Sequence, residues 1–163
     1  MIRRNEQGFT LPELIVTTVG FIVLFGLAAL LLAPSTHTSE KLDARRRLDV
    51  AATVQAVNRY IADAGKLPPD VPDTPVVIGT SDEEYDLCFG LAGKYLPAMP
   101  LDPQLGVRLA QDDTTERGGS ADCDDLDVEY SAGYTIVRHG DAVVVATAFT
   151  DGRPFTLRSQ PAD

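Results

Sequence analysis

The hydrophobic pattern of the chain opens with a long apolar run. Residues 14–33 carry no charge at twenty consecutive positions. A helix rises about 1.5 Å per residue, so this run covers ~30 Å, which is the hydrocarbon thickness of a bilayer. We therefore expect a membrane-spanning helix over residues 9–33, with Glu13 at its edge. A carboxylate in lipid costs ~2–3 kcal/mol or more unless it is paired, so Glu13 is a functional candidate.

An amphipathic pattern follows a polar break at residues 34–39. Apolar residues recur there at steps of four, three and four, which predicts one face of a helix, and further apolar residues widen that face. Gly65 predicts a helix end near Ala64. We expect residues 34–66 to form the amphipathic half of a long first helix that continues past Pro34 with a bend. The stripe consists of Val50, Val54, Val57 and Ile61, widened by Leu48, Ala51 and Ala52.

The head begins at residue 67 with a connecting region. Ser81 and Glu84 have the spacing of a capping box, which predicts a connecting helix over about residues 82–95. Residues 76–78 suit either a short strand or a plug over the first helix. One face of the connecting helix is expected to carry Tyr85, Cys88, Phe89, Ala92, Tyr95 and Leu96.

The last third of the chain changes to a period of two, which is typical of strands. An acidic loop over residues 111–129 precedes this pattern, and tight turns at residues 138–141 and 150–153 divide it. We expect a three-stranded antiparallel meander over about residues 130–158. Its inner face should cover the apolar stripe of the helix, because a helix on a sheet is sufficient for one core.

Charge and composition exclude several functions. The formal net charge is −10, and residues 62–163 hold seven Lys or Arg against nineteen Asp or Glu. Such a head offers no basic field for nucleic acid, so we expect no direct nucleic-acid partner. His37 and His139 lie far apart in sequence, without a cysteine cluster or a nearby nucleophile, and no phosphate-binding glycine loop is present. We expect no enzymatic activity.

The run Arg45–Arg47 places three positive charges on the amphipathic helix, flanked by Glu40, Asp43 and Asp49. A charge run on a helix is usually a solvated face. Pairing of these arginines with acids on a neighbouring subunit is the alternative. The sequence leaves both interpretations open.

The N-terminus carries a processing motif. A short basic leader, residues 1–8, ends in Gly8, Phe9 follows, and Glu13 lies five residues after the glycine, ahead of the apolar run. This pattern resembles the class III signal peptide of the type IV pilin and pseudopilin superfamily. Pro12 stands where an aliphatic residue is commoner, and proline is tolerated in the first turn of a helix.

The resemblance implies roles for three residues and a set of partners. Prepilin peptidase would cleave after Gly8, and Phe9 would then be N-methylated. Glu13 would pair with the Phe9 α-ammonium of a neighbouring subunit, because an α-amino group with a pKa near ~8 is cationic at neutral pH. The implied partners are further copies of this chain, other pilins, prepilin peptidase, the inner-membrane assembly platform of a pilus or secretion system, and membrane lipid before assembly.

The leader and the two cysteines bear on location. Arg3 and Arg4 favour a cytoplasmic N-terminus, so the head is expected outside the cell membrane, first on a single-pass protein and later in an extracellular or periplasmic filament. Disulfides persist in such compartments. Cys88 and Cys123 lie 35 residues apart, and a bridge between them would stabilise the fold by ~3–4 kcal/mol. We prefer the bridge to a buried free thiol at Cys88.

A resemblance to pseudopilins of type II secretion adds one metal hypothesis. Residues 94–103, KYLPAMPLDP, are similar to the proline-rich "YLP..P.DP" passage of the major pseudopilin. Pseudopilins of that system bind calcium in a loop at a similar place, and carboxylate oxygens are the ligands that calcium prefers. We expect no cofactor and prefer a solvated acidic loop, with a structural calcium ion as the alternative. Its candidate ligands are Asp112, Asp113, Asp122, Asp124, Asp125 and Asp127.

The expected protein is thus an α+β, pilin-like structural subunit, with a long N-terminal helix packed on a small antiparallel β-meander. Small residues on the apolar helix, Gly20 and Gly26 with Ala28 and Ala29, would allow close packing into a helical filament. The alternative is a membrane-anchored monomeric extracytoplasmic binding protein with an uncleaved signal anchor. Major pilins, minor pilins and pseudopilins share the motif, so adhesion, motility, secretion and DNA uptake all stay open.

Overall fold

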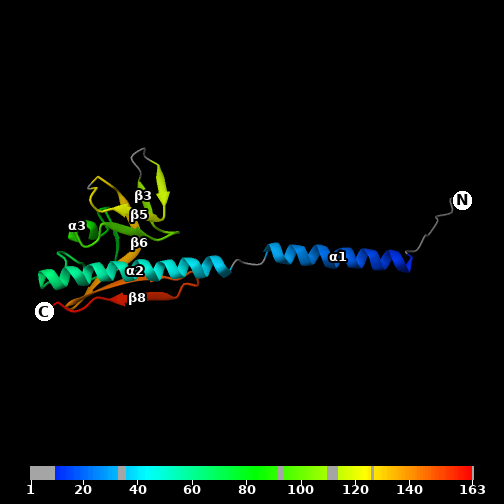
Figure 1. Cartoon of the computed structure of the whole chain (residues 1–163), viewed down its shortest axis with the longest axis horizontal. Helices are drawn as coiled ribbons and strands as arrows, with labels where there is room; N and C mark the ends of the chain where they lie inside the picture. The colour runs from blue at the N-terminus through cyan, green and yellow to red at the C-terminus, as the bar shows by residue number, and fades with distance from the viewer. Residues whose placement is uncertain (1–9, 33–35, 92–93, 110–113, 126, 163) are drawn as a thin grey trace. The chain divides into compact units, whose positions relative to one another are not determined.

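The computed structural model describes residues 10–32, 36–91, 94–109, 114–125 and 127–162, without the side chains of residues 28–32 and 36–37. The chain divides into two compact units, residues 1–36 and 37–163. The first unit contains helix α1, Leu11–Leu32. The second is an α+β head in which a long helix packs on antiparallel strands (Figure 1).

The elements of the head form one main sheet, a small ribbon and two helices. Strands β4, β3, β6, β7 and β8 pair in that order, β1 also pairs with β6, and β2 pairs with β5 in a separate two-stranded ribbon. Helix α2 spans Thr36–Ala64 and α3 spans Leu87–Leu91. The strands are β1 (Val76–Gly79), β2 (Ala98–Leu101), β3 (Val107–Leu109), β4 (Thr115–Arg117), β5 (Gly119–Asp122), β6 (Tyr130–His139), β7 (Ala142–Ala148) and β8 (Pro154–Arg158).

Helix α2 buries the stripe that the sequence predicts. Its four apolar residues belong to the same core as side chains of β6 and β7, which confirms the expected α+β architecture of a helix on an antiparallel sheet. The helix ends at Ala64 because Gly65 adopts a positive φ of 64° and donates its N–H to the Ile61 carbonyl at 2.8 Å. The buried contacts are Val50, Val54, Val57 and Ile61 with Tyr134, Ile136, Val143 and Val145.

The residues expected to widen that stripe do not reach the core. Leu48 is 68% exposed, and Ala51 and Ala52 are exposed as well. The reason is that one face of α2 is enough to cover the sheet. Leu48 and its two alanine neighbours therefore form a second apolar face, which points to solvent.

Strands β6, β7 and β8 form the expected meander within a larger sheet. Ile136 lies opposite Val145, and Val145 lies opposite Leu157, in antiparallel register. Residues 76–78 belong to a strand rather than a plug, because β1 pairs with β6 along its other edge.

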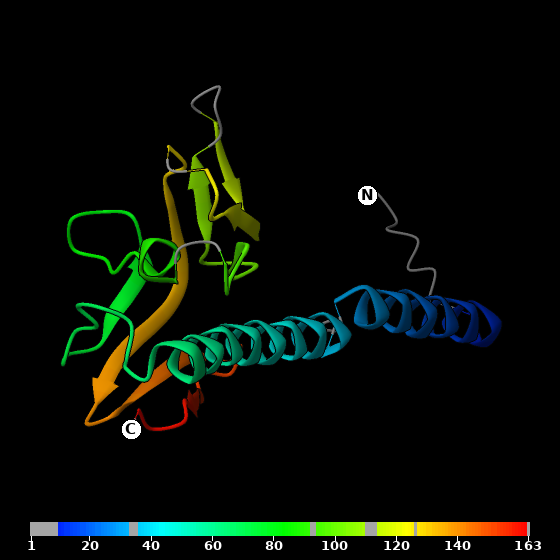
Figure 2. The ribbon, with the colours of Figure 1, turned by 60° about the vertical axis from the view of Figure 1, so that its left-hand side comes forward.

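Strands β3 and β7 both pair with one edge of β6, each at a different end of it (Figure 2). Ile136 is paired with β1 on one side and with β7 on the other, whereas Ser131 is paired with β1 and with β3. Strands β3 and β7 therefore line the same edge, at opposite ends of β6. Between β3 and β7 the Asp102 N–H donates to the Ala132 carbonyl at 2.8 Å. The chain that follows β2 therefore fills the gap between these two strands, which we call the fork on β6.

Gly133 makes this close approach feasible. Its φ is 74°, in the region that side chains rarely adopt. A Cβ on Gly133 would lie 2.9 Å from the Leu105 Cβ and 3.0 Å from the Asp102 Cβ. The glycine therefore lets the segment around Asp102 lie directly against β6.

The structure corrects the expected connecting helix of about residues 82–95. Ser81 and Glu84 form a turn instead, in which the Glu84 N–H donates to the Ser81 carbonyl at 2.9 Å. The Glu84 carboxylate also accepts the Ser131 hydroxyl of β6 at 2.5 Å. This tertiary contact holds residues 81–84 beside the sheet, so the capping-box spacing does not start a helix.

Helix α3 starts later and buries a different face. The Asp86 carboxylate accepts the Phe89 N–H at 3.1 Å and so caps the helix. Leu87 and Leu91 are buried, whereas Phe89, expected on the apolar face, is 74% exposed. Ala92 lies outside the described residues.

The expected acidic loop of residues 111–129 also contains regular structure. Strand β4 pairs with β3, and β5 pairs with β2. In the ribbon, buried Ala121 lies opposite buried Met99. Buried Ala121 and Cys123 alternate with exposed Ser120 and Asp122, and this short alternation packs β5 onto β2 despite the surrounding acids.

Candidate assembly site

Helix α1 exposes large apolar side chains around its circumference. A helix that is apolar on all sides needs an apolar environment or other helices to cover it. The side chains concerned are 53–74% exposed and comprise Leu11, Leu14, Ile15, Val16, Val19, Phe21, Ile22, Val23, Leu24, Phe25 and Leu27. Residues 9 and 33 of the expected span lie outside the described residues. Among the residues that the structure describes, no helix combines the length and hydropathy needed to cross a membrane.

Glu13 is the one charged residue in the α1 sequence and lies in its first turn. Its side chain is exposed, and a carboxylate is favoured at that end of a helix by the peptide dipoles. The Thr17 hydroxyl donates to the Glu13 backbone carbonyl at 2.9 Å, and the Leu14 N–H donates to the Thr10 carbonyl at 3.1 Å. Glu13 is therefore carried by a regular helical turn. The expected cleavage and methylation positions, Gly8 and Phe9, lie outside the described residues.

Two glycines flatten the surface of α1. A Cβ added at Gly20 or at Gly26 would meet no other atom within 4 Å. Phe21 and Phe25 lie one turn apart beside them, with ring centroids separated by 6.3 Å. Small residues next to large ones allow another helix to approach closely, which is how helices associate in an apolar environment.

In the head, the arginine run is divided between the core and the surface. Arg46 is only 3% exposed, and its Nε donates to Oδ2 of fully buried Asp102 at 2.7 Å. Its Nη1 donates to Asp43 and Thr150, and its Nη2 donates to Asp102 and Gln104. All five N–H bonds of the guanidinium are thus directed at oxygen acceptors within the same chain. For Arg46, both interpretations drawn from the sequence are wrong.

Asp102 also organises the loop that fills the fork on β6. Its Oδ1 accepts the N–H groups of Gln104 and Leu105 at 2.8 and 2.9 Å. Burial raises the pKa of the Asp102 carboxyl, but the hydrogen bonds from Arg46 and from these two N–H groups outweigh it, so its pKa lies below the usual value. The hydrogen bond to Asp102 also raises the pKa of Arg46, so both Arg46 and Asp102 are ionised at neutral pH.

A second buried acid, Asp49, lies on α2 about one helical turn after Arg46. Asp49 accepts the hydroxyl of buried Tyr134 at 2.9 Å, and Arg45 lies 2.9 Å from its other oxygen. Burial raises the pKa of Asp49 despite these two contacts, and burial beside Asp49 also raises the pKa of Tyr134. This contact joins α2 to the middle of β6, next to the Arg46–Asp102 pair.

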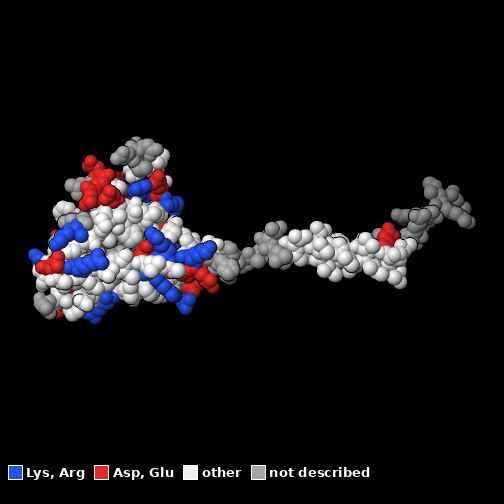
Figure 3. All heavy atoms as spheres, viewed as in Figure 1, with Lys and Arg blue, Asp and Glu red and all other residues white. Residues whose placement is uncertain are grey.

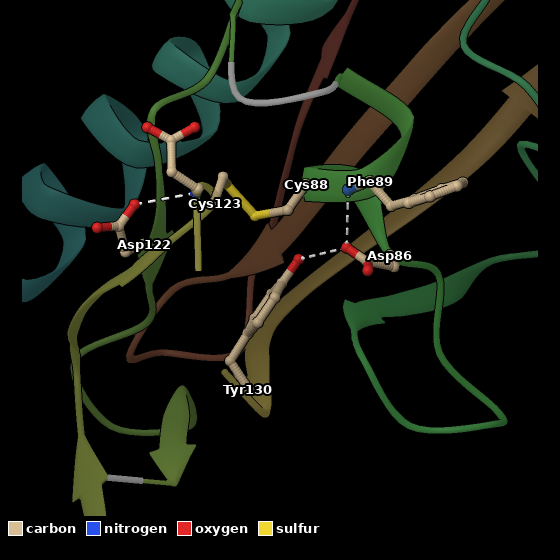
Figure 4. Close-up of a disulfide and its surroundings, with 7 residues drawn as sticks. Asp86, Cys88, Phe89, Asp122, Cys123 and Tyr130 are labelled. Atoms are coloured by element: carbon tan, nitrogen blue, oxygen red, sulfur yellow. Dashed lines mark hydrogen bonds between the residues drawn. A yellow bond between two sulfur atoms is a disulfide. The ribbon is translucent and has the colours of Figure 1, made fainter. Parts of the chain in front are cut away.

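The two cysteines form a disulfide, which is the pairing preferred from the sequence (Figure 4). The bond joins Cys88 of α3 to Cys123, which directly follows β5, with the two Cα atoms 5.0 Å apart. The carboxylate of Asp86, which directly precedes α3, accepts the Tyr130 hydroxyl at 3.1 Å. Helix α3 is therefore fastened both to the ribbon and to β6.

The structure describes four of the six candidate calcium ligands, Asp122, Asp124, Asp125 and Asp127. The Asp122 carboxylate accepts the Asp124 N–H at 3.0 Å, and the Asp125 carboxylate accepts the Asp127 N–H at 3.2 Å. These short turns use the carboxylates locally, and within the described part of the chain no three metal-ligating side chains lie close enough to hold an ion. Asp112 and Asp113 lie outside the described residues. His139 is exposed at the end of β6.

The role expected for Glu13 stays a prediction, and the Arg46–Asp102 pair was not predicted from the sequence. One signal was available, because Arg46 lies four residues before Val50 and so continues the buried stripe by one turn. Asp102 carries no comparable signal, since its partner lies 56 residues away. Comparison of the chain with protein-family models, with curated proteins and with solved structures gives no match.

Proposed function

We propose that the chain is a pilin-like structural subunit that polymerises into an extracytoplasmic helical filament. The observation that carries the proposal is the exposed apolar surface of α1 with a single carboxylate, Glu13, in the first turn. The leader motif around Gly8 and Phe9 adds a means of producing a free N-terminus next to that carboxylate. The head supports the proposal only by its coarser architecture, a helix on an antiparallel sheet.

The mechanism follows from the physical properties of α1. In a bilayer, lipid tails cover its apolar side chains, and in a filament the helices of neighbouring copies replace the lipid. The hydrophobic effect contributes little to this exchange, so close packing at Gly20 and Gly26 and the charge on Glu13 decide whether the helices associate.

The pairing of charges would set the axial register. After cleavage behind Gly8, the Phe9 α-ammonium of one copy would meet the Glu13 carboxylate of its neighbour. Two unit charges 4 Å apart attract each other by about 4 kcal/mol at an effective dielectric constant near 20. A neighbour shifted by one helical turn leaves the carboxylate unpaired and so loses this stabilisation.

The test replaces Glu13 in the full chain in its native membrane. Glu13→Val should insert normally, because it removes a charge from an apolar helix, but filament yield should fall about tenfold or more. Glu13→Asp keeps the charge and serves as the matched control, with a yield much closer to wild type. Wild-type yield from Glu13→Val, measured by electron microscopy and shear fractionation, would refute the pairing.

Processing provides the second arm. Mass spectrometry of the native protein should find a chain that begins at methylated Phe9, and Gly8→Asp should leave residues 1–8 attached. An uncut leader on the wild-type chain, together with a failure to form filaments, would overturn the proposal. That result would favour the alternative, a membrane-anchored monomeric binding protein.

A further inference from the structure

A shallow groove runs between α2 and β8 on the surface of the head. It has a volume of about 480 Å³, and no charged side chain is among the described residues that line it. Its walls are mainly apolar, and Leu48 is 68% exposed at its rim. The lining residues are Leu48, Ala51, Ala52, Val54, Gln55 and Leu157, with Asn58 at one end. This groove is the second apolar face of α2 described above.

Contacts at both ends fix the groove. At one end the Arg47 guanidinium lies 4.8 Å from the Phe149 ring centroid and 6.0 Å from that of Phe155 in β8. At the other end the Gln160 N–H donates to the Asn58 side-chain oxygen at 2.7 Å. Helix α2 and β8 are thus tied together on either side, so the groove is a built surface.

Arginines flank the groove along the helix. Arg45 lies seven residues before Ala52 and Arg59 seven residues after it, and a helix returns to nearly the same face after seven residues. Each arginine therefore lies about 10 Å from Ala52 along the axis. Arg45 is already paired with Asp49 at 2.9 Å, so the surface combines an apolar centre with the positive charge of Arg59, in a chain whose net charge is −10.

A complementary surface lies around the disulfide. We call this surface the disulfide corner, and it consists of Phe89, Asp122, Asp124 and Asp125. Phe89 is 74% exposed although it adjoins buried Cys88, and the three acids beside Cys123 are exposed. Figure 3 shows acidic side chains gathered near β5 and basic ones along α2. Nothing in the described core accounts for the exposure of Phe89.

The dimensions of the two surfaces agree. The Cα atoms of Cys88 and Cys123 are 5.0 Å apart, and each step to a chain neighbour adds about 3.8 Å. The Cα atoms of Phe89 and Asp124 are therefore at most about 13 Å apart. This upper limit allows a ring in the centre of the groove and a carboxylate at Arg59, about 10 Å along the helix.

We propose that the groove between α2 and β8 binds the disulfide corner of a second copy of this chain. Phe89 occupies the apolar centre, and Asp124 with its neighbouring acids pairs with Arg59, whose planar guanidinium group suits carboxylates. The contact joins two different patches, so it is heterologous and can repeat from copy to copy along a filament rather than closing a two-fold dimer. It rests on the proposed function, to which it adds a contact between heads.

The test detects the contact directly in assembled full-length protein. Chains with the conservative change Arg59→Lys, half of them labelled with ¹⁵N, are assembled together and treated with a zero-length carbodiimide. We expect a mixed-isotope amide bond between position 59 and an acid of the disulfide corner. The amine of Lys66, which is exposed outside the groove, is the internal control and should not link to that corner. Filaments without the link at position 59 would overturn the proposal.

Charge reversal provides an independent arm. Arg59→Glu should reduce assembly about tenfold, because like charges then face each other, and Asp124→Arg in the same chain should restore most of it. Lys66→Glu makes the same change in net charge and should assemble normally. Equal losses from Arg59→Glu and Lys66→Glu, or no recovery in the double variant, would contradict a specific pair.

The two proposals fail in different ways. Wild-type filaments that form without the link leave the proposed function intact and refute only the head contact. An uncut leader without filaments refutes the proposed function, and the contact between heads that depends on it then falls as well.

Discussion

The Nε atom of Arg46 lies 2.7 Å from Oδ2 of Asp102, and both side chains are buried although 56 residues separate them. This pair fastens α2 to the loop that fills the fork on β6. Coulomb attraction in a buried site is offset by the loss of hydration, so an intact pair contributes little net stability. Removing one partner is costly, because the other charge then stays buried without compensation.

Substitution of Asp102 should therefore strongly destabilise the head. We expect Asp102→Asn to lower the free energy of unfolding by about 3–5 kcal/mol, because the Arg46 charge loses its counter-ion. Urea denaturation of the full chain in detergent, followed by circular dichroism, measures the change. Asp73→Asn is the matched control, because Asp73 pairs with Arg138 on the surface and is 74% exposed. That change should cost less than about 1 kcal/mol, and equal losses from both variants would contradict the role of burial.

The pH dependence of stability should reflect two acids, Asp102 and Asp49, whose pKa values shift in opposite directions on folding. The pKa of Asp102 is lowered in the fold, so its contribution is present above its unfolded pKa of ~3.9 and is lost as pH falls through the folded value. The pKa of Asp49 is raised, so its contribution is present below ~3.9 and is lost as pH rises through its folded value. Unfolding midpoints in urea between about pH 2 and about pH 5 should show a shallower acid limb in Asp102→Asn. A wild-type acid limb in that variant would exclude Asp102 as its source.

Loss of the disulfide should loosen the ribbon and α3 first. A bridge that closes a loop of 35 residues stabilises by about 3–4 kcal/mol in the chain-entropy estimate. The double variant Cys88→Ala, Cys123→Ala should lose about that amount. Hydrogen exchange should show reduced protection in β2 and β5 before β6 and β7 are affected. Dithiothreitol should have no effect on the variant, and unchanged protection of the ribbon would contradict the prediction.

Substitutions at two glycines should distinguish the cost of backbone strain from the cost of a steric contact. Gly133 and Gly140 both have positive φ values, 74° and 65°, but a Cβ on Gly140 would meet no atom within 4 Å. We expect Gly140→Ala to cost about 1 kcal/mol through backbone conformation alone. Gly133→Ala should cost at least twice as much, because its Cβ would also press on Leu105 and Asp102. Equal shifts in thermal unfolding would refute the close approach of that loop to β6.

The sequence predicted the elements whose pattern is local. The stripe from Val50 to Ile61, the end of α2 at Ala64 and the meander of β6, β7 and β8 all follow from periodicity and turn residues. In each case the neighbours that decide the structure lie within one helical turn or one hairpin.

Elements decided by distant partners were not predicted. Glu84 is held by Ser131, so residues 81–84 form a turn rather than a helix start. Strand β5 exists because Ala121 packs opposite Met99, and the surrounding acids hide that alternation. Neither interpretation of the arginine run places Arg46 in the core, because its partner belongs to a loop that propensity does not place.

The fork on β6 also has a mechanical consequence. Asp102 holds Arg46 through its side chain and Ala132 through its backbone N–H, so it lies in series between helix and sheet. Tension applied along α2 reaches the central strand β6 through this residue and through the Asp49–Tyr134 contact. A subunit stretched from its N-terminal end would thus take up the strain in the middle of its sheet, where neighbouring strands share it.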